Sequence, residues 1–205
     1  MKIITLVFAL SISLTLSGCQ SLGDEWAKSA SNTFLKMTGN NNSANNASGT
    51  GTGGANSSGN TTGSITLSGP DTSMVGTTLD TGFVGTSIAA GSQPNHIAIV
   101  DRLSTVTFNA PNILIPNNVD PSNGFVLVVT DDSPSSGIKG ISMSIVISGA
   151  KYDYLCTTVA SRSMIHCGSN SITLDIANKS VTLNNVNVEN ADTKTVLTLA
   201  GQLSW

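Results

Sequence analysis

The side chains best suited to chemistry in this chain are its cysteines, two of which lie close together in the carboxyl-terminal half. Cys156 and Cys167 are separated by a short segment, and His166 directly precedes the second cysteine. One interpretation is a metal site, but zinc takes four ligands, or three and a water, at spacings that these residues do not match. The other interpretation is a disulfide, which an oxidising compartment favours. We therefore expect a Cys156–Cys167 disulfide, no metal and no cofactor.

Two histidines and a few aspartates are the remaining candidates for catalysis. His96 and Asp101 could join one of many serines in a hydrolytic triad, but the chain has no Gly-x-Ser-x-Gly elbow. Asp131 and Asp132 lead into a Ser-Pro turn pattern, which favours turn capping over a glycosidase pair. A calcium site from these two residues and Asp120 is the alternative, although their spacing matches no calcium loop. We expect no catalytic residues and no enzymatic activity.

Tyr152 and Tyr154 are the one pair of aromatic residues whose spacing indicates a binding surface. Residues two apart in a strand share a face, so the two rings could form a small platform for a sugar or a peptide. The alternative is a purely structural role, in which both are amphipathic tyrosines at the edge of the core, and the sequence favours it.

The charge balance excludes one class of partner. The chain has 9 basic and 12 acidic residues, and charged residues make up only 10% of it. Nucleic-acid binding needs a basic stripe that displaces phosphate counterions, and the sequence contains none. Thr, Ser and Asn supply most of the polarity instead, which suits strands with uncharged polar faces.

The third cysteine, Cys19, follows an apolar amino-terminal run. Met1 and Lys2 precede residues 3–16, a stretch too short to span a membrane as a helix. The following sequence, Leu16-Ser17-Gly18-Cys19, resembles the lipobox of bacterial lipoproteins. The resemblance implies a signal peptide over 1–18, cleavage before Cys19, diacylglycerol on its thiol and a further fatty acyl chain, such as palmitate, on its new amine. An ordinary signal peptide with an accidental cysteine is the alternative.

The residue after Cys19 predicts which membrane holds the protein. In that family, aspartate at this position retains the protein in the inner membrane, whereas this chain has Gln20. The resemblance therefore implies the outer membrane of a Gram-negative envelope.

Two segments separate the lipobox from the rest of the chain. Within 19–37, Leu22, Trp26, Ala30 and Phe34 recur at steps of four, which indicates a short amphipathic helix on the membrane surface. A frayed segment, or a helix packed on the domain, is the equal alternative. Residues 38–63 are uncharged Asn, Gly, Ser, Thr and Ala, with almost nothing to bury. We expect a disordered linker that tethers a domain to the membrane.

Residues 64–205 form an all-β domain in this interpretation. Short Val-, Ile-, Thr- and Leu-rich runs alternate with Gly, Pro, Asn and Asp. The pattern favours a two-sheet β-sandwich, with a barrel as the alternative. We expect a bulge at Asn184-Asn185 and a loop or edge connection in the proline-containing segment 110–124. Strands are predicted near 64–68, 83–88, 97–100, 104–109, 125–130, 138–148, 151–156, 163–167, 171–176, 180–188 and 194–205.

These observations predict the cellular location of the protein more clearly than its activity. The expected protein is a cell-envelope lipoprotein with a non-enzymatic structural or binding β-domain. A carbohydrate- or peptide-binding module centred on Tyr152 and Tyr154 is the alternative. The expected partners are the membrane, through the lipid anchor, and an envelope protein or glycan.

Overall fold

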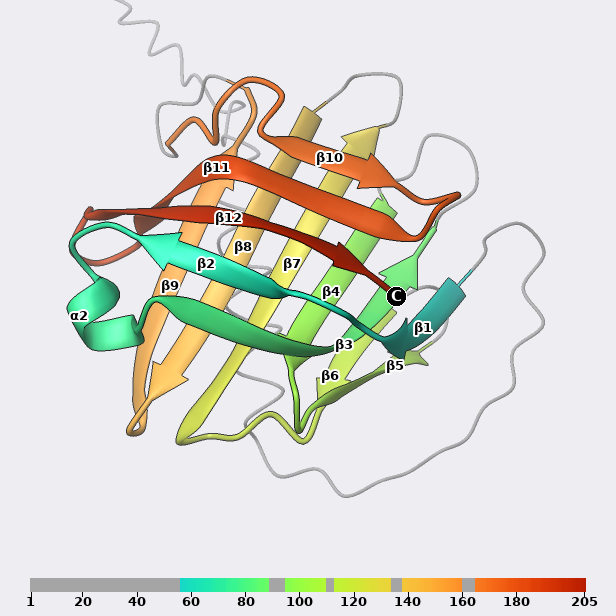
Figure 1. Cartoon of the computed structure of the whole chain (residues 1–205), viewed down its shortest axis with the longest axis horizontal. Coiled ribbons are helices and arrows are strands. Elements are labelled where there is room, and N and C mark those ends of the chain that lie inside the picture. The colour runs from blue at the N-terminus through green and yellow to red at the C-terminus, as the bar shows by residue number, and fades with distance from the viewer. Residues whose placement is uncertain (1–55, 89–94, 110–112, 134–137, 160–164) are drawn as a thin grey trace, which may run out of the picture.

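The computed structural model describes residues 56–88, 95–109, 113–133, 138–159 and 165–205 of the chain (Figure 1). The expected signal peptide, Cys19, the segment 19–37 and residues 38–55 of the expected linker lie outside these ranges, so the expectations for them stay predictions. The described ranges contain twelve strands and one short helix, α2 (Thr72–Val75). None of their helical structure is long and apolar enough to cross a bilayer. The strands are β1 (Asn56–Asn60), β2 (Ser64–Ser68), β3 (Thr78–Ser87), β4 (Asn95–Asp101), β5 (Thr105–Asn109), β6 (Ile113–Asn117), β7 (Asn123–Ser133), β8 (Ile138–Ile147), β9 (Ala150–Thr157), β10 (Ile172–Asp175), β11 (Ser180–Asn190) and β12 (Val196–Ser204).

Alternation of apolar and polar residues determines which face of each strand is buried. In β12, Leu197, Leu199 and Leu203 are at most 1% exposed, whereas Gln202 and Ser204 between and beyond them face solvent. β2 shows the same period of two, with Ile65 and Leu67 buried. Each fully buried side chain of this size contributes about 1.5–3 kcal/mol relative to an exposed one. The period-two pattern therefore fixes the register of each strand relative to a single core.

The strands close into an antiparallel barrel. The hydrogen-bonded order is β3-β2-β12-β11-β9-β8-β7-β4, and β4 pairs again with β3. β3 makes this closure possible because Ser64 and Thr66 of β2 pair with its first residues, whereas β4 pairs with its second half. The barrel is flattened, so that β2, β3, β11 and β12 cross in front of β4, β7, β8 and β9 (Figure 1). The all-β expectation is confirmed, and the architecture is the barrel that was predicted as the alternative to a sandwich.

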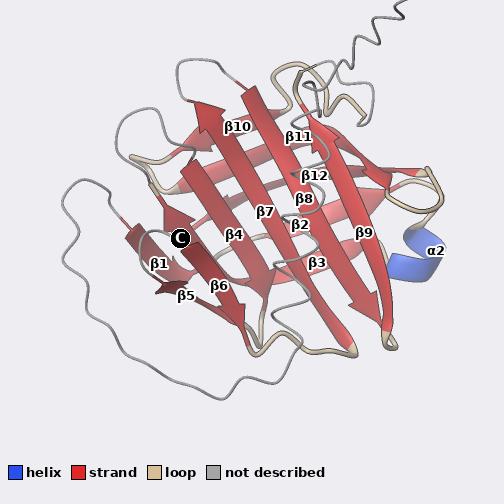
Figure 2. Ribbon diagram, turned by 180° about the vertical axis from the view of Figure 1, so that it is seen from behind, coloured by secondary structure: helices blue, strands red, loops and turns tan. Residues whose placement is uncertain are grey.

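A second, smaller core lies outside the barrel. β5 and β6 form a separate two-stranded sheet (Figure 2). Val106 of β5 and Leu114 of β6 pack with Val100 and Ala98, which are on the outward face of β4. Both faces of β4 are thereby buried, since its Ile97 and Ile99 point into the barrel. This explains why the run 97–100 is continuously apolar rather than alternating.

Several predicted strand bounds are shorter than the strands observed, as for β3, and at three places the structure differs by a whole strand. β1 lies inside the range assigned to the linker and pairs with β3 from Asn56↔Ser87 to Asn60↔Phe83. β6 lies in the segment expected to be a loop or an edge connection, and Pro116 is tolerated there because β6 pairs only with β5. The strand expected near 163–167 is reduced, in its described part, to a single bridge at His166. The predicted bulge is confirmed, because the β11–β12 register shifts between Leu183 and Val186.

Candidate binding cleft at the barrel mouth

The barrel wall is incomplete where β9 meets β11. Only Leu155 and Tyr154 of β9 pair with β11, opposite Glu189 and Asn190. Beyond that point the segment 165–167 lies between the two strands. The amide of Thr157 donates to the Ile165 carbonyl (3.1 Å), and the amide of Cys167 donates to the Thr157 carbonyl (2.9 Å). On the other side, the amide of Asn187 in β11 donates to the Cys167 carbonyl (3.1 Å).

The expected disulfide holds this inserted segment in place. Cys156 and Cys167 are bonded, with 5.1 Å between their Cα atoms, and both lie in the main core. The geometry differs from a stapled antiparallel hairpin, because Thr157 and His166 form a parallel bridge. The disulfide therefore anchors a short segment to the strand beside it and completes the wall of the barrel.

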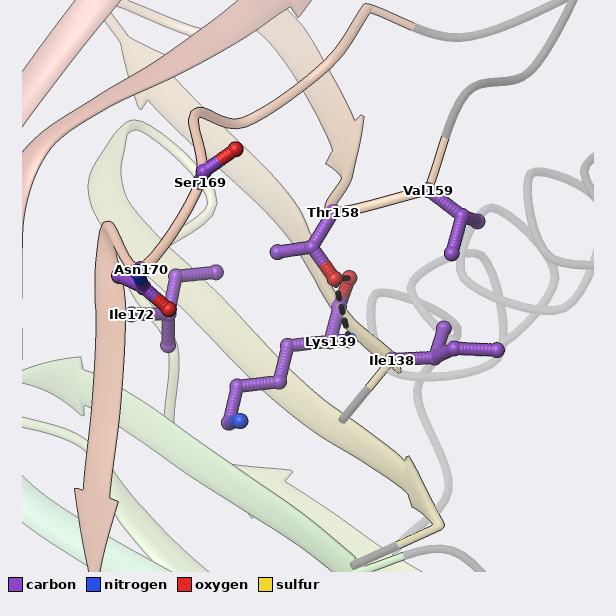
Figure 3. Close-up of a pocket in the computed structure, with 7 residues that line it drawn as sticks. All are labelled: Ile138, Lys139, Thr158, Val159, Ser169, Asn170 and Ile172. Atoms are coloured by element: carbon purple, nitrogen blue, oxygen red, sulfur yellow. Dashed lines mark hydrogen bonds between the residues drawn. The ribbon is translucent and has the colours of Figure 1, made fainter. Parts of the chain in front are cut away.

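A cleft opens next to this seam, where β11 pairs with β10 instead of β9. We call this end of the barrel its mouth. It has a volume of about 240 Å³ and lies between the start of β8, the end of β9 and the turn before β10 (Figure 3). Its polar lining consists of Lys139, Thr158, Ser169 and Asn170. Three apolar side chains complete it: Ile138, Val159 and Ile172.

Lys139 is the one charged residue among the cleft-lining side chains. It alternates in phase with Ile141, Met143 and Ile145, whose side chains fill the barrel, so its side chain also starts from the inward face of β8. Thr158 fixes the backbone at this point, because Thr158 Oγ1 accepts from the Lys139 amide at 2.7 Å. The long side chain extends into the cleft (Figure 3). Among the described residues, no carboxylate oxygen lies within 4.0 Å of its ammonium.

A carboxylate stands on the neighbouring strand. Asp131 of β7 is the direct cross-strand partner of Lys139, and it alternates in phase with the buried Leu127 and Val129. Directly opposed residues on one face of a sheet have Cβ atoms about 4.5–5.5 Å apart. Asp131 Oδ1 is enclosed by protein and accepts no hydrogen bond. Asp131 and Lys139 make no ion pair within the described residues, and Asp131 is not one of the residues that line the cleft.

The two tyrosines do not form an outward-facing platform. Tyr154 is 0% exposed, and its hydroxyl donates to Asp71 Oδ2 at 2.9 Å. Tyr152 shares the inward face and packs, half-buried, against the same core. A ring inside the barrel cannot stack on a ligand outside it, so the platform interpretation of Tyr152 and Tyr154 is corrected to a core role.

The catalytic and metal sets considered from the sequence are not assembled either. His96 and Asp101 stand at the two ends of the described part of β4: His96 Nδ1 is 2.9 Å from Thr130 Oγ1, and Asp101 accepts from the Ser104 hydroxyl at 2.8 Å. Asp120 precedes β7, whereas Asp131 lies near its other end. His166 Nδ1 accepts from the amide of Gly168. Across the described ranges, no three His, Cys, Asp or Glu side chains are arranged to hold a metal ion.

Sequence reasoning missed Lys139 and favoured turn capping for Asp131 over a carboxylate pair or a calcium site. Both residues could have been recognised from the sequence, because each falls on the apolar face of an alternating strand. A charged residue that falls on the apolar face of an alternating strand must lie in the core or at a barrel end, where it needs a partner. No family model, curated protein or solved structure matches this chain. Its function therefore has to be inferred from its own residues and geometry.

Proposed function

We propose that this chain is a membrane-anchored lipoprotein of the bacterial cell envelope, and that its barrel has a non-enzymatic binding or structural role. The observation that carries the proposal is the lipobox-like sequence Leu16-Ser17-Gly18-Cys19 behind an apolar run. One acyl chain binds a membrane only marginally, whereas two or more anchor it stably. A cysteine that carries diacylglycerol and an amide-linked acyl chain would hold the barrel at the membrane.

The barrel itself supports export. Its Cys156–Cys167 disulfide is suited to an oxidising compartment and would be uncommon in a reducing cytosol. Gln20 after the lipidated cysteine favours the outer membrane. The linker would give the barrel reach from that surface toward an envelope protein or a glycan.

Metabolic labelling with a palmitate analogue tests the anchor. We expect the full chain to be labelled and to fractionate with membranes, and Cys19→Ala to lose the label. The double variant Cys156→Ala, Cys167→Ala is the matched control, because it removes the other two thiols and should keep the label. An unlabelled wild type in the soluble fraction would refute the proposal.

A ligand-binding module is the second candidate function. The observation that favours it is the polar cleft at the barrel mouth, since the tyrosine pair is not exposed as a platform. A thermal-shift screen of sugars, peptides and small metabolites on the full chain would test it. Stabilisation by one class of compound supports binding, whereas no shift with any class supports the structural role.

A further inference from the structure

β10 has one free edge at the barrel mouth, because it pairs with β11 and with no other strand of the described ranges (Figure 1). The amide of Asn184 in β11 donates to the Ser171 carbonyl (2.8 Å), so Ser171 directs its carbonyl toward β11. Backbone groups alternate between the two edges of an antiparallel strand, and Thr173 is therefore directed toward β11 as well. Ile172 and Leu174 direct their N–H and C=O groups away from it, to the free edge.

The opposite side of the same sheet gives the same phase. Ser204 of β12 exchanges both backbone hydrogen bonds with Thr62 (3.0 and 3.4 Å), so its backbone groups point away from β11. The next residue, Leu203, is then directed toward β11, where it pairs with Val181. Thr182 is consequently directed toward the opposite residue of β10. Two independent sets of hydrogen bonds thus define the donors and acceptors that β11 leaves unused.

Apolar side chains lie beside this free edge. Ile172 and Leu174 share the inward face of β10, and Leu174 is only half-buried although it packs on the main core. The mouth cleft lies at the Ile172 end of β10, where Val159 is 40% exposed and Ile138 is half-buried. A strand added to this edge places every second side chain on that face. It therefore covers apolar surface in addition to pairing backbone groups.

We propose that the free edge of β10 binds an extended segment of another protein, which adds as an antiparallel strand with apolar side chains at alternate positions. Backbone hydrogen bonds to Ile172 and Leu174 provide affinity, and the mouth cleft accepts one apolar side chain. Every pairing between the named strands of the described ranges is antiparallel, which favours that direction for the added strand.

A second copy of this chain fits the edge less well. Pairing of β10 with the β10 of another copy is limited to the four residues of that strand, which is little against the entropic cost of association. A longer segment also reaches the cleft. This inference deepens the ligand-binding candidate, on which it rests, and does not depend on lipidation.

The probe for this edge is a fluorescent peptide of alternating valine and threonine, with a lysine at each end for solubility. Its binding to the detergent-solubilised full chain is measured by fluorescence anisotropy. In the proposed alignment the valines lie on the inward face and exchange hydrogen bonds with Ile172 and Leu174. N-methylation of the valines should weaken binding by about tenfold or more, because it removes the donors that face β10. N-methylation of the threonines is the matched control, since it removes only donors that face away.

Two outcomes with these peptides would overturn the proposal. One is an equal effect of the two N-methylations, because pairing at the edge requires the donors of the valines alone. The other is no saturable binding of the unmethylated peptide below about 1 mM.

Variants of β10 locate the binding. Leu174→Pro removes an N–H at the free edge and keeps the hydrogen bonds between β10 and β11, and proline is tolerated at strand edges. Leu174→Ala is the matched control, because it shortens the same side chain and keeps the N–H. We expect Leu174→Pro to bind the peptide about tenfold more weakly than Leu174→Ala. Equal binding by the two folded variants would contradict edge pairing, and the methylated peptides test it even where Leu174→Pro does not fold.

Sedimentation of the full chain without peptide tests the other occupant. A dimer that Leu174→Pro abolishes would replace the partner segment by a second copy. Binding of a sugar or small metabolite in the thermal-shift screen, with none of the peptide, would overturn this inference and leave the ligand-binding candidate standing. Palmitate labelling reports on the anchor alone, so the lipoprotein proposal can fail separately.

Discussion

Asp71 ties together elements that are far apart in the sequence. It directly precedes α2, at one end of the barrel (Figure 1), and it is only 2% exposed. Its side chain does not cap the helix. Instead Oδ2 accepts from Tyr154 Oη (2.9 Å), Thr195 Oγ1 (2.7 Å) and Asn190 Nδ2 (3.4 Å). Because a buried carboxylate is costly without donors, this network fixes the start of α2 to Tyr154 of β9, Asn190 at the end of β11 and Thr195 just before β12.

Removal of one donor tests the network. Tyr154→Phe keeps the ring in the core but takes away a hydrogen bond to a buried carboxylate. We expect a loss of about 1.5–3 kcal/mol in the free energy of unfolding, measured by urea denaturation. Tyr152→Phe is the control, since Tyr152 lies on the same face and makes no hydrogen bond to Asp71. Equal effects of the two variants would contradict a special role for Tyr154.

The same tyrosine predicts a pH dependence. Burial is the main cause that raises the pKa of Tyr154 above its ordinary value of 10.0, and the hydrogen bond and charge of Asp71 act in the same direction. The folded state therefore keeps this proton at a pH where the unfolded chain has lost it. Stability should be unaffected below about pH 10 and should fall as pH rises above it. Tyr154→Phe should show a smaller fall over that alkaline range, whereas an identical profile would contradict the assignment.

At the scale of elements, strands with a strong alternating pattern could be predicted and the others could not. β2 has the predicted bounds 64–68, and β12 lies within the predicted range 194–205, where its alternating leucines are buried. β1 was missed because Asn-Ser-Ser-Gly-Asn has no apolar alternation, so only its pairing with β3 defines it as a strand. β6 was missed because prolines dominate its neighbourhood. Barrel closure was also beyond prediction, since it depends on β3 pairing with two partners distant in sequence.

The outer β5–β6 sheet gives a test of its own. Gly85 of β3 lies under this sheet, and a Cβ added there would be 2.5 Å from Val106 Cγ1. Gly85→Ala should therefore push the sheet outward and lower stability by about 1–3 kcal/mol in chemical denaturation. Gly59→Ala in β1 is the control, because its added Cβ would meet nothing closer than 3.8 Å. Unchanged stability of Gly85→Ala would mean that the sheet does not pack tightly on β3.

The disulfide should act on one seam more than on the whole barrel. Closing so short a loop contributes about 2–3 kcal/mol in the chain-entropy model. We expect Cys156→Ala with Cys167→Ala to lower stability by about that amount. Hydrogen exchange should speed up at two backbone amides, that of residue 167 and that of Asn187, because these amides join the inserted segment to the barrel wall. Amides of the β7–β8 pair serve as the internal reference, and equal acceleration there would contradict a local effect.

For the whole molecule, the remaining question is where the expected linker ends and the folded unit begins. The sequence placed that boundary after residue 63, yet β1 pairs along five residues of β3, and the amide of Thr61 continues the pairing to the Gly82 carbonyl (3.1 Å). Residues 56–63 therefore belong to the barrel, where they cover an edge of β3 that a boundary at 63 would leave bare. An uncovered strand edge invites pairing with another chain.

Two truncated chains decide this boundary. A chain that begins at residue 56 should unfold like the full protein. A chain that begins at residue 64 should lose roughly 1 kcal/mol for each backbone hydrogen bond that β1 makes, and it should self-associate through the freed edge of β3. Denaturation midpoints and gel filtration measure the two effects, and both chains lack residues 1–55, so any effect of those residues cancels from the comparison. Equal midpoints and a monomeric shorter chain would return 56–63 to the tether. A difference would show that a five-residue polar segment without apolar residues forms part of the barrel, because its backbone hydrogen bonds need no hydrophobic pattern.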